Sequence, residues 1–141
     1  MAGSIYDHRA QMKVDATNVA AGGMTLLAAR IKLGYEAITP NADRIRQMLD
    51  EGPYMIIRSG AKADHVPVGA SRISTFDIPV DLWIGLERQT DDDMTNLEKL
   101  LEAIDEAWID HVTTWDAPVI STKQNSALVH VALSVEVKSG C

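Results

Sequence analysis

Two stretches of strict alternation constrain the fold of this chain more than any other feature. Between Ile78 and Leu86, and again between Val129 and Val137, aliphatic residues occupy every second position. Because successive side chains of a β-strand point to opposite faces, each stretch predicts a strand with one apolar face. The aliphatic positions are Ile78, Val80, Leu82, Ile84, Leu86, Val129, Val131, Leu133, Val135 and Val137. Such a face needs a second layer to cover it.

The stretch between the two strands has the spacing of a helix that supplies this layer. Thr95 is a candidate N-cap, because Glu98 lies three residues later, as in a capping box. We expect the helix to extend from Thr95 to Val112, with an acidic face opposite its apolar one. The apolar positions recur at three- and four-residue intervals and are Leu97, Leu100, Leu101, Ile104, Trp108 and Val112.

Ahead of the first strand the pattern predicts two shorter helices. Helical spacing indicates one over residues 24–33, with Gly34 as its C-terminal cap. A second is expected from Pro40 to Glu51, with Thr39 as the N-cap and Gly52-Pro53 as its stop.

A β-rich run from Tyr54 to Arg58 follows the second helix. We expect residues 60–76 to form a projecting β-loop. Val66 and Val68 in this loop flank Pro67, which cannot donate to a β-ladder and therefore suits an edge.

A length of 141 residues fits a single domain, 1–141. Residues 1–23 are expected to form an N-terminal arm, since the Gly22-Gly23 pair disfavours a helix there. The order of helices and strands predicts an α+β fold: a mainly antiparallel sheet with a projecting β-loop, packed against a long amphipathic helix and shorter N-terminal helices.

Charge and cysteine content exclude several classes of protein. The formal net charge is -7, so the chain as a whole repels phosphate backbones, which argues against a nucleic-acid binder. The single cysteine, Cys141, cannot form an intrachain disulfide or a cysteine-based metal site. No apolar run reaches the length of a membrane span and no secretory signal is visible, so we expect a cytosolic product.

The sequence offers no constellation of residues for catalysis, and we expect neither a cofactor nor a metal. Phosphate-binding glycine motifs and a nucleophile elbow are absent. Asp91, Asp92 and Asp93 have oxygen ligands for a hard cation, but at a helix start they are better interpreted as solvated carboxylates that complement the helix dipole. The histidines are too far apart for a metal-ligand spacing: His8, His65, His111 and His130.

The tryptophans indicate contact surfaces. Trp83 alternates with the aliphatic residues of the first strand, so it is expected to point away from the main core. Large apolar groups left outside a core usually mark binding surfaces. Trp115, in the loop expected after the long helix, is a second candidate. The remaining interface candidates are Val66, Val68, Asp91, Asp92 and Asp93.

This arrangement resembles the tail-terminator (tail-completion) proteins at the neck of tailed bacteriophages. The resemblance rests on the strand I-P-V-D-L-W-I-G-L-E (Ile78–Glu87), the acidic turn, the helix Thr95–Val112 and the last strand (Ala127–Val137), preceded by the projecting β-loop and a short helical part. It covers roughly the last two-thirds of the chain and contains no short signature motif.

The resemblance implies a structural virion protein without catalytic residues. Its subunits would close into a homo-oligomeric ring, a hexamer, that caps the tail tube and joins it to the head connector. DNA would pass through the ring without sequence-specific binding and without a membrane partner. Assembly would take place in the host cytoplasm, and the protein would end in the neck of the virion.

Three alternatives remain open. In the first, the chain is another neck component, such as a head-closure or tail-completion adaptor. In the second, it is an adaptor that pairs an exposed strand edge with a strand of a partner. The third is a small anion-binding domain or enzyme, with a site between the β-loop and the helix Pro40–Glu51, formed by Arg44, Arg46, Arg58 and Arg72.

Overall fold

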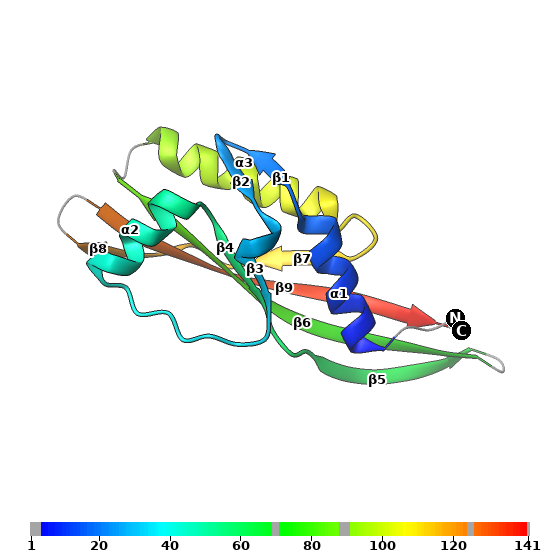
Figure 1. Cartoon of the computed structure of the whole chain (residues 1–141). Helices are drawn as coiled ribbons and strands as arrows, with labels where there is room; N and C mark the ends of the chain where they lie inside the picture. Colours follow the sequence, from blue (N-terminus) through cyan, green and yellow to red (C-terminus); the bar gives the residue numbers. More distant parts are fainter. Residues whose placement is uncertain (1–3, 69–70, 88–90, 124–125, 141) are drawn as a thin grey trace.

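A computed structural model describes residues 4–68, 71–87, 91–123 and 126–140, with the backbone alone at 63–68, 71–74, 91 and 139–140. The described elements form an α+β fold built on a mainly antiparallel sheet (Figure 1). In chain order they are α1 (Ile5–Ala16), β1 (Val19–Ala21), β2 (Met24–Leu26), η1 (Ala28–Arg30), β3 (Ile31–Leu33), α2 (Ala42–Glu51), β4 (Tyr54–Ile57), β5 (Ala61–Val68), β6 (Ser71–Leu86), α3 (Asp91–Ala107), β7 (Val112–Trp115), β8 (Val119–Lys123) and β9 (Ser126–Gly140).

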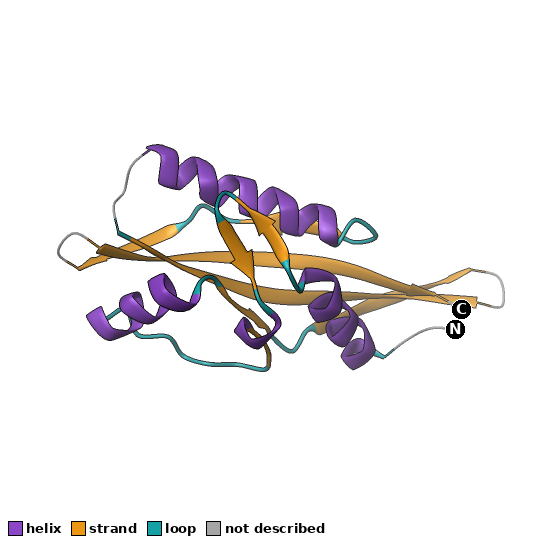
Figure 2. Ribbon diagram, turned by 45° about the horizontal axis from the view of Figure 1, so that its top comes forward, coloured by secondary structure: helices purple, strands orange, loops and turns teal. Residues whose placement is uncertain are grey.

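The two alternating stretches form the central strands, as predicted. β6 and β9 pair antiparallel from Ile73↔Gly140 to Leu86↔Ala127, and they run the length of the molecule (Figure 2). All ten aliphatic positions of the alternation are buried. Their side chains therefore form one continuous apolar face, which we call the core face of the sheet.

Each central strand has two short neighbours on its outer side. β4 and β5 pair with successive parts of β6, and β7 and β8 pair with successive parts of β9. β3 lies parallel to β4 and ends the sheet on that side. The β5–β6 pairing confirms the β-loop expected over residues 60–76.

Helices α3 and α1 cover the core face. α3 buries the predicted apolar strip from Leu97 to Ile104. It begins four residues before Thr95, because the three aspartates occupy its first turn, where the helix dipole favours negative charge. It also ends early: the β-prone run Val-Thr-Thr-Trp becomes strand β7, and Val112 is exposed instead of buried.

Residues 4–23, the described part of the expected N-terminal arm, are folded onto the core and do not form an arm. Ser4 caps α1 and forms a capping box with Asp7. Met12 and Ala16 are fully buried in the core, and the indole Nε1–H of Trp108 donates a hydrogen bond to the carbonyl oxygen of Met12 at 3.0 Å. Burial in the core thus stabilises a helix whose own apolar periodicity is too weak to predict it.

The prediction of a helix over residues 24–33 is wrong. Gly22 and Gly23 both have positive φ and form the two-residue turn of the β1–β2 hairpin, which packs on α3. Gly-Gly is a preferred pair for such a turn, because both central residues need positive φ. The remainder of this segment forms η1 and the short strand β3.

Helix α2 confirms the predicted second helix and its end at Glu51, but it begins at Ala42 instead of Pro40 and has a different cap. Asn41, and not Thr39, accepts the first hydrogen bond from the backbone N–H of Arg44 at 2.8 Å. Gly52 ends the helix at φ 90°. Ile45 and Met48 pack with Tyr54, Ile56 and Leu128 in a second cluster on the face of the sheet opposite the core face.

In the described part of the chain, no helix is both long and apolar enough to cross a membrane.

Candidate functional site

The outer edge of the sheet, formed by β7 and β8, and the turn that leads into β7 carry many exposed apolar side chains. Of nine large apolar side chains that are exposed among those described, five lie between Ile109 and Ile120. Val112 is 59% exposed and Val119 61%, while Trp115 and Ile120 are each 38% exposed. We call Ile109, Val112, Trp115, Val119 and Ile120 the edge patch.

The local sequence explains why this edge remains open. Asp116-Ala117-Pro118 separates the two short strands, and the backbone N–H of Asp116 still donates to the carbonyl oxygen of Ala132 at 3.0 Å. β7 and β8 use one side of their backbone to pair with β9. The other side has no neighbouring strand in the described sheet, so its N–H and C=O groups face outward.

The edge patch is divided between the two faces of the sheet. Trp115 is opposite Leu133 and Ile120 is opposite Val129, so both point to the core face. Val119 is opposite His130, on the other face. The patch is therefore a strip along the rim of the sheet, which suits edge-on contact with another molecule better than contact with either face.

Trp115 lies in a strand, and not in a loop as expected. It ends β7 and borders a groove of about 290 Å³ between the first half of α3 and the β7–β8 connection. Apolar atoms of Met94 and Leu101 line this groove beside the indole, and Glu98 and Glu102 stand on its α3 side.

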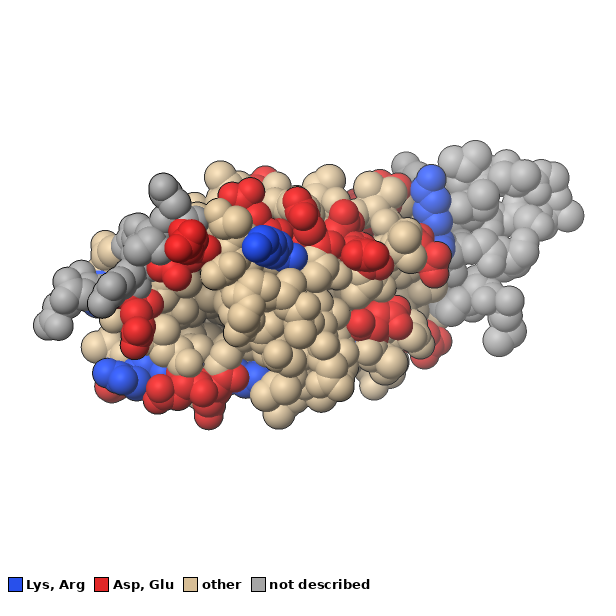
Figure 3. Space-filling model, turned by 90° about the horizontal axis from the view of Figure 1, so that it is seen from above, with Lys and Arg blue, Asp and Glu red and all other residues tan. Residues whose placement is uncertain are grey.

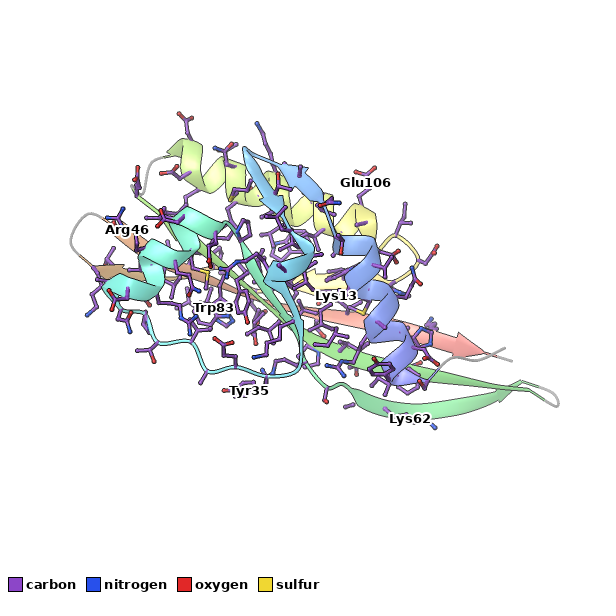
Figure 4. The ribbon with its side chains drawn as sticks, viewed as in Figure 1. Lys13, Tyr35, Arg46, Lys62, Trp83 and Glu106 are labelled. Atoms are coloured by element: carbon purple, nitrogen blue, oxygen red, sulfur yellow. The ribbon has the colours of Figure 1, made fainter. Side chains whose placement is uncertain are left out.

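Trp83 lies on the face opposite the main core, as predicted, but it does not stand free. Its indole stacks on the imidazole of His130, with ring centroids 4.3 Å apart and an angle of 19° between the planes. It also packs against the second cluster, between α2 and the segment that carries Tyr35 (Figure 4). Trp83 is thus partly covered by its own chain, and it is a weaker interface candidate than the edge patch.

A polar pair that the sequence did not single out lies beside Trp83. The Nε2 of His130 is 2.8 Å from Oδ1 of Asp81, and Arg58 Nη1 is 3.7 Å from the other carboxylate oxygen. The guanidinium of Arg58 also lies over the ring of Tyr35, 4.9 Å from its centroid. The β6–β9 register brings Asp81 and His130 together, and neither residue belongs to a motif.

An aspartate–histidine pair is a component of general-base sites, but it needs a nucleophile to activate. By register, Asp81 is opposite Ile56 and Ala132, and all residues opposite the pair are apolar, since those opposite His130 are Trp83 and Val119. Of the described residues, none with a hydroxyl or thiol group is hydrogen-bonded to the pair. We interpret the pair as a cross-strand link between β6 and β9.

The other interface candidates are divided between described and undescribed positions. Asp92 is exposed and Asp93 is partly buried, both in the first turn of α3. The side chain of Asp91 lies outside the described residues, as do those of Val66 and Val68 in β5. Among the described side chains no three metal-ligating groups lie together.

Of the arginines proposed for an anion site, the three with described side chains have different surroundings. Arg44 Nη2 is 2.9 Å from a carboxylate oxygen of Glu36, Arg58 faces Asp81, and Arg46 lies exposed on α2. The side chain of Arg72 lies outside the described residues. Two of these cations are therefore already paired with carboxylates of the chain itself, which weakens the anion-site alternative.

Glu36 is the centre of a small polar cluster near this face. Burial alone would raise its pKa, but hydrogen bonds from Tyr54 and Lys32 and the charge of Arg44 outweigh burial and lower the pKa. The same contact acts in the opposite direction on its partner: burial and the bond to Glu36 raise the pKa of the Tyr54 hydroxyl. The cluster thus fixes the segment after β3 against β4.

Comparison with known proteins gives no family for this sequence. A scan against protein-family models finds no family that matches the sequence, and a search of curated proteins finds no match.

Proposed function

We propose that this chain is a structural subunit of the neck of a tailed bacteriophage, a tail terminator that closes into a ring on the end of the tail tube. The observation that carries the proposal is the edge patch on the outer rim of the sheet. Exposed apolar side chains concentrated on one segment are typical of a surface that binds protein.

The sheet also has the asymmetry that a ring requires. In a closed ring each subunit contacts its two neighbours through two different surfaces. One rim of this sheet is formed by β7 and β8, and the opposite rim by β3 and β5. Because the rims differ in strand order and in composition, contact between the rim of one subunit and the opposite rim of the next is heterologous. Such contacts form a ring when the rotation that relates neighbouring subunits closes on itself.

The charge of the surface agrees with passage of DNA without binding. On the face that carries α3, acidic side chains predominate over lysine and arginine (Figure 3). A net charge of -7 avoids the counterion release that would hold DNA in place. In this proposal the partners are copies of the chain, the tail-tube protein and the head connector, and assembly occurs in the host cytoplasm before the protein becomes part of the virion.

The test is whether the protein caps growing tail tubes. The protein is added to the polymerising tail-tube protein of the same phage, and tube lengths are measured by negative-stain electron microscopy. We expect tubes that stop growing and carry a ring at one end. Unchanged tube lengths with bare ends would contradict the terminator proposal, and binding to the head connector alone would instead support a head-closure role.

A matched pair of variants connects this test to the edge patch. Val119→Lys places a charge in the patch, and Val14→Lys places one on the equally exposed outer side of α1. Capping is expected to fail with Val119→Lys and to persist with Val14→Lys. Equal capping by both would remove the edge patch from the interface.

A further inference from the structure

The groove beside Trp115 is the second surface of this molecule with the features of a binding site. Met94, Leu101 and Trp115 give the groove an apolar part of its lining. Leu101 is buried, but Trp115 remains 38% exposed although its side chain points to the core face of the sheet. An apolar base that is left open in this way is suited to an apolar side chain from another molecule.

The rim of the groove carries charge of one sign. Glu98 and Glu102 lie one helical turn apart on α3, and Asp116 lines the groove from the β7–β8 connection. All three side chains are exposed. The residues that line the groove include no lysine or arginine in the described chain, so the rim is uniformly acidic.

We propose that this groove binds a basic segment of a different protein, with a bulky apolar side chain seated on Trp115 and flanking lysines or arginines paired with Glu98, Glu102 and Asp116. Apolar anchors surrounded by complementary charge are the usual composition of such contacts. The proposal does not rest on the ring, although it shares Trp115 with the edge patch, because the acidic side chains lie on the α3 side of the rim and the partner is a different protein.

The charge of the chain argues against a second copy as the occupant. The protein carries a net charge of -7. Several of its cations are held by its own carboxylates, among them Arg30 by Glu51, Lys32 by Glu36 and Arg58 by Asp81. A second copy would therefore bring further negative charge to an acidic groove, whereas a basic partner removes the repulsion.

The test uses a capped peptide that alternates lysine and leucine, added to the isotope-labelled full chain and followed by NMR. We expect a saturable shift of the Trp115 indole N–H and of the backbone amides between Met94 and Glu102. Affinity should fall at least about tenfold in the double variant Glu98→Lys/Glu102→Lys, whose amide dispersion reports whether it remains folded.

Two controls separate specific docking from general attraction. Glu106 lies further along the same helix, is exposed and does not line the groove, so Glu106→Lys is expected to bind the peptide like the wild type (Figure 4). A peptide that alternates glutamate and leucine should cause no shift. No response of the Trp115 indole, or equal loss of affinity in the Glu106→Lys and Glu98→Lys/Glu102→Lys variants, would overturn the proposal.

Discussion

Trp108, the residue directly after α3, connects that end of the helix to α1. Its side chain is almost fully buried, and its Nε1–H donates to the carbonyl oxygen of Met12. In the sequence it is simply another apolar position of a helix. The hydrogen bond to a residue 96 positions away is visible only in the fold, because it depends on where α1 packs.

Replacement of Trp108 by Phe should therefore destabilise the protein by about 1–3 kcal/mol, through the lost hydrogen bond and the cavity that remains. Trp115→Phe is the control: its side chain is partly exposed, and the change should be within about 0.5 kcal/mol. Urea denaturation measures both. Equal costs would show that the contact with Met12 contributes little.

His8 gives the fold a dependence on pH. It lies on α1 with its ring 5.9 Å from that of Phe76 and 6.5 Å from that of His111. Among described atoms, His8 Nε2 and His111 Nδ1 are buried and have no hydrogen-bond partner. Burial, and then the charge of His111, lower the pKa of His8 below its ordinary value of 6.5, although Asp7 acts in the opposite direction.

The sign of the effect follows from linkage. The unfolded chain binds the His8 proton more readily than the folded chain, so the stabilisation is complete above pH 6.5 and is lost as pH falls toward the lower, folded-state pKa. Wild-type protein should lose more stability between about pH 7.5 and about pH 5.5 than His8→Gln does. Parallel stability curves for the two proteins, from urea midpoints at each pH, would exclude His8 as the cause.

The elements that the sequence predicted correctly are those whose pattern repeats over many residues. β6, β9, α2 and α3 each show several turns or alternations, so a local exception does not hide them. The elements that it missed are short or depend on packing. The β1–β2 hairpin is specified by a glycine pair that also disfavours helix, and α1 has too weak an apolar stripe to identify without the core that covers it.

The glycine pair offers a direct test of the hairpin. A Cβ at Gly22 would overlap the backbone of Asn96 on α3, whose Cα would be only 2.8 Å away, and φ is +61°. Gly23 has φ +78° but nothing within 4 Å of its Cβ position. Gly23→Ala should cost about 1–2 kcal/mol from strain alone, and Gly22→Ala distinctly more.

Thermal unfolding of the two alanine variants measures this difference. If Gly22→Ala is no less stable than Gly23→Ala, the hairpin does not pack on α3 as described.

At the scale of the whole molecule, the long antiparallel strands β6 and β9 form the centre of a sheet whose two rims differ. The candidate interface lies on the rim formed by β7 and β8. The sequence predicts the fold class and the face of the sheet on which Trp83 lies, because both follow from the alternation of apolar residues along the strands. The sequence also points to Trp83 and to a loop around Trp115 as contact surfaces. It does not reveal that α2 partly covers Trp83 or that β7, with Trp115, pairs with β9, because both depend on tertiary structure. The exposed valines of the edge patch look in the sequence like core residues.

The most direct test of the proposed function is the native mass of the purified chain, alone and on tail-tube protein, compared with that of Val119→Lys. A ring of about six wild-type subunits, absent in Val119→Lys, is the expected result. A wild-type protein that stays monomeric at every concentration and on the tube, or a Val119→Lys protein that assembles like the wild type, would contradict assembly through the β7–β8 rim.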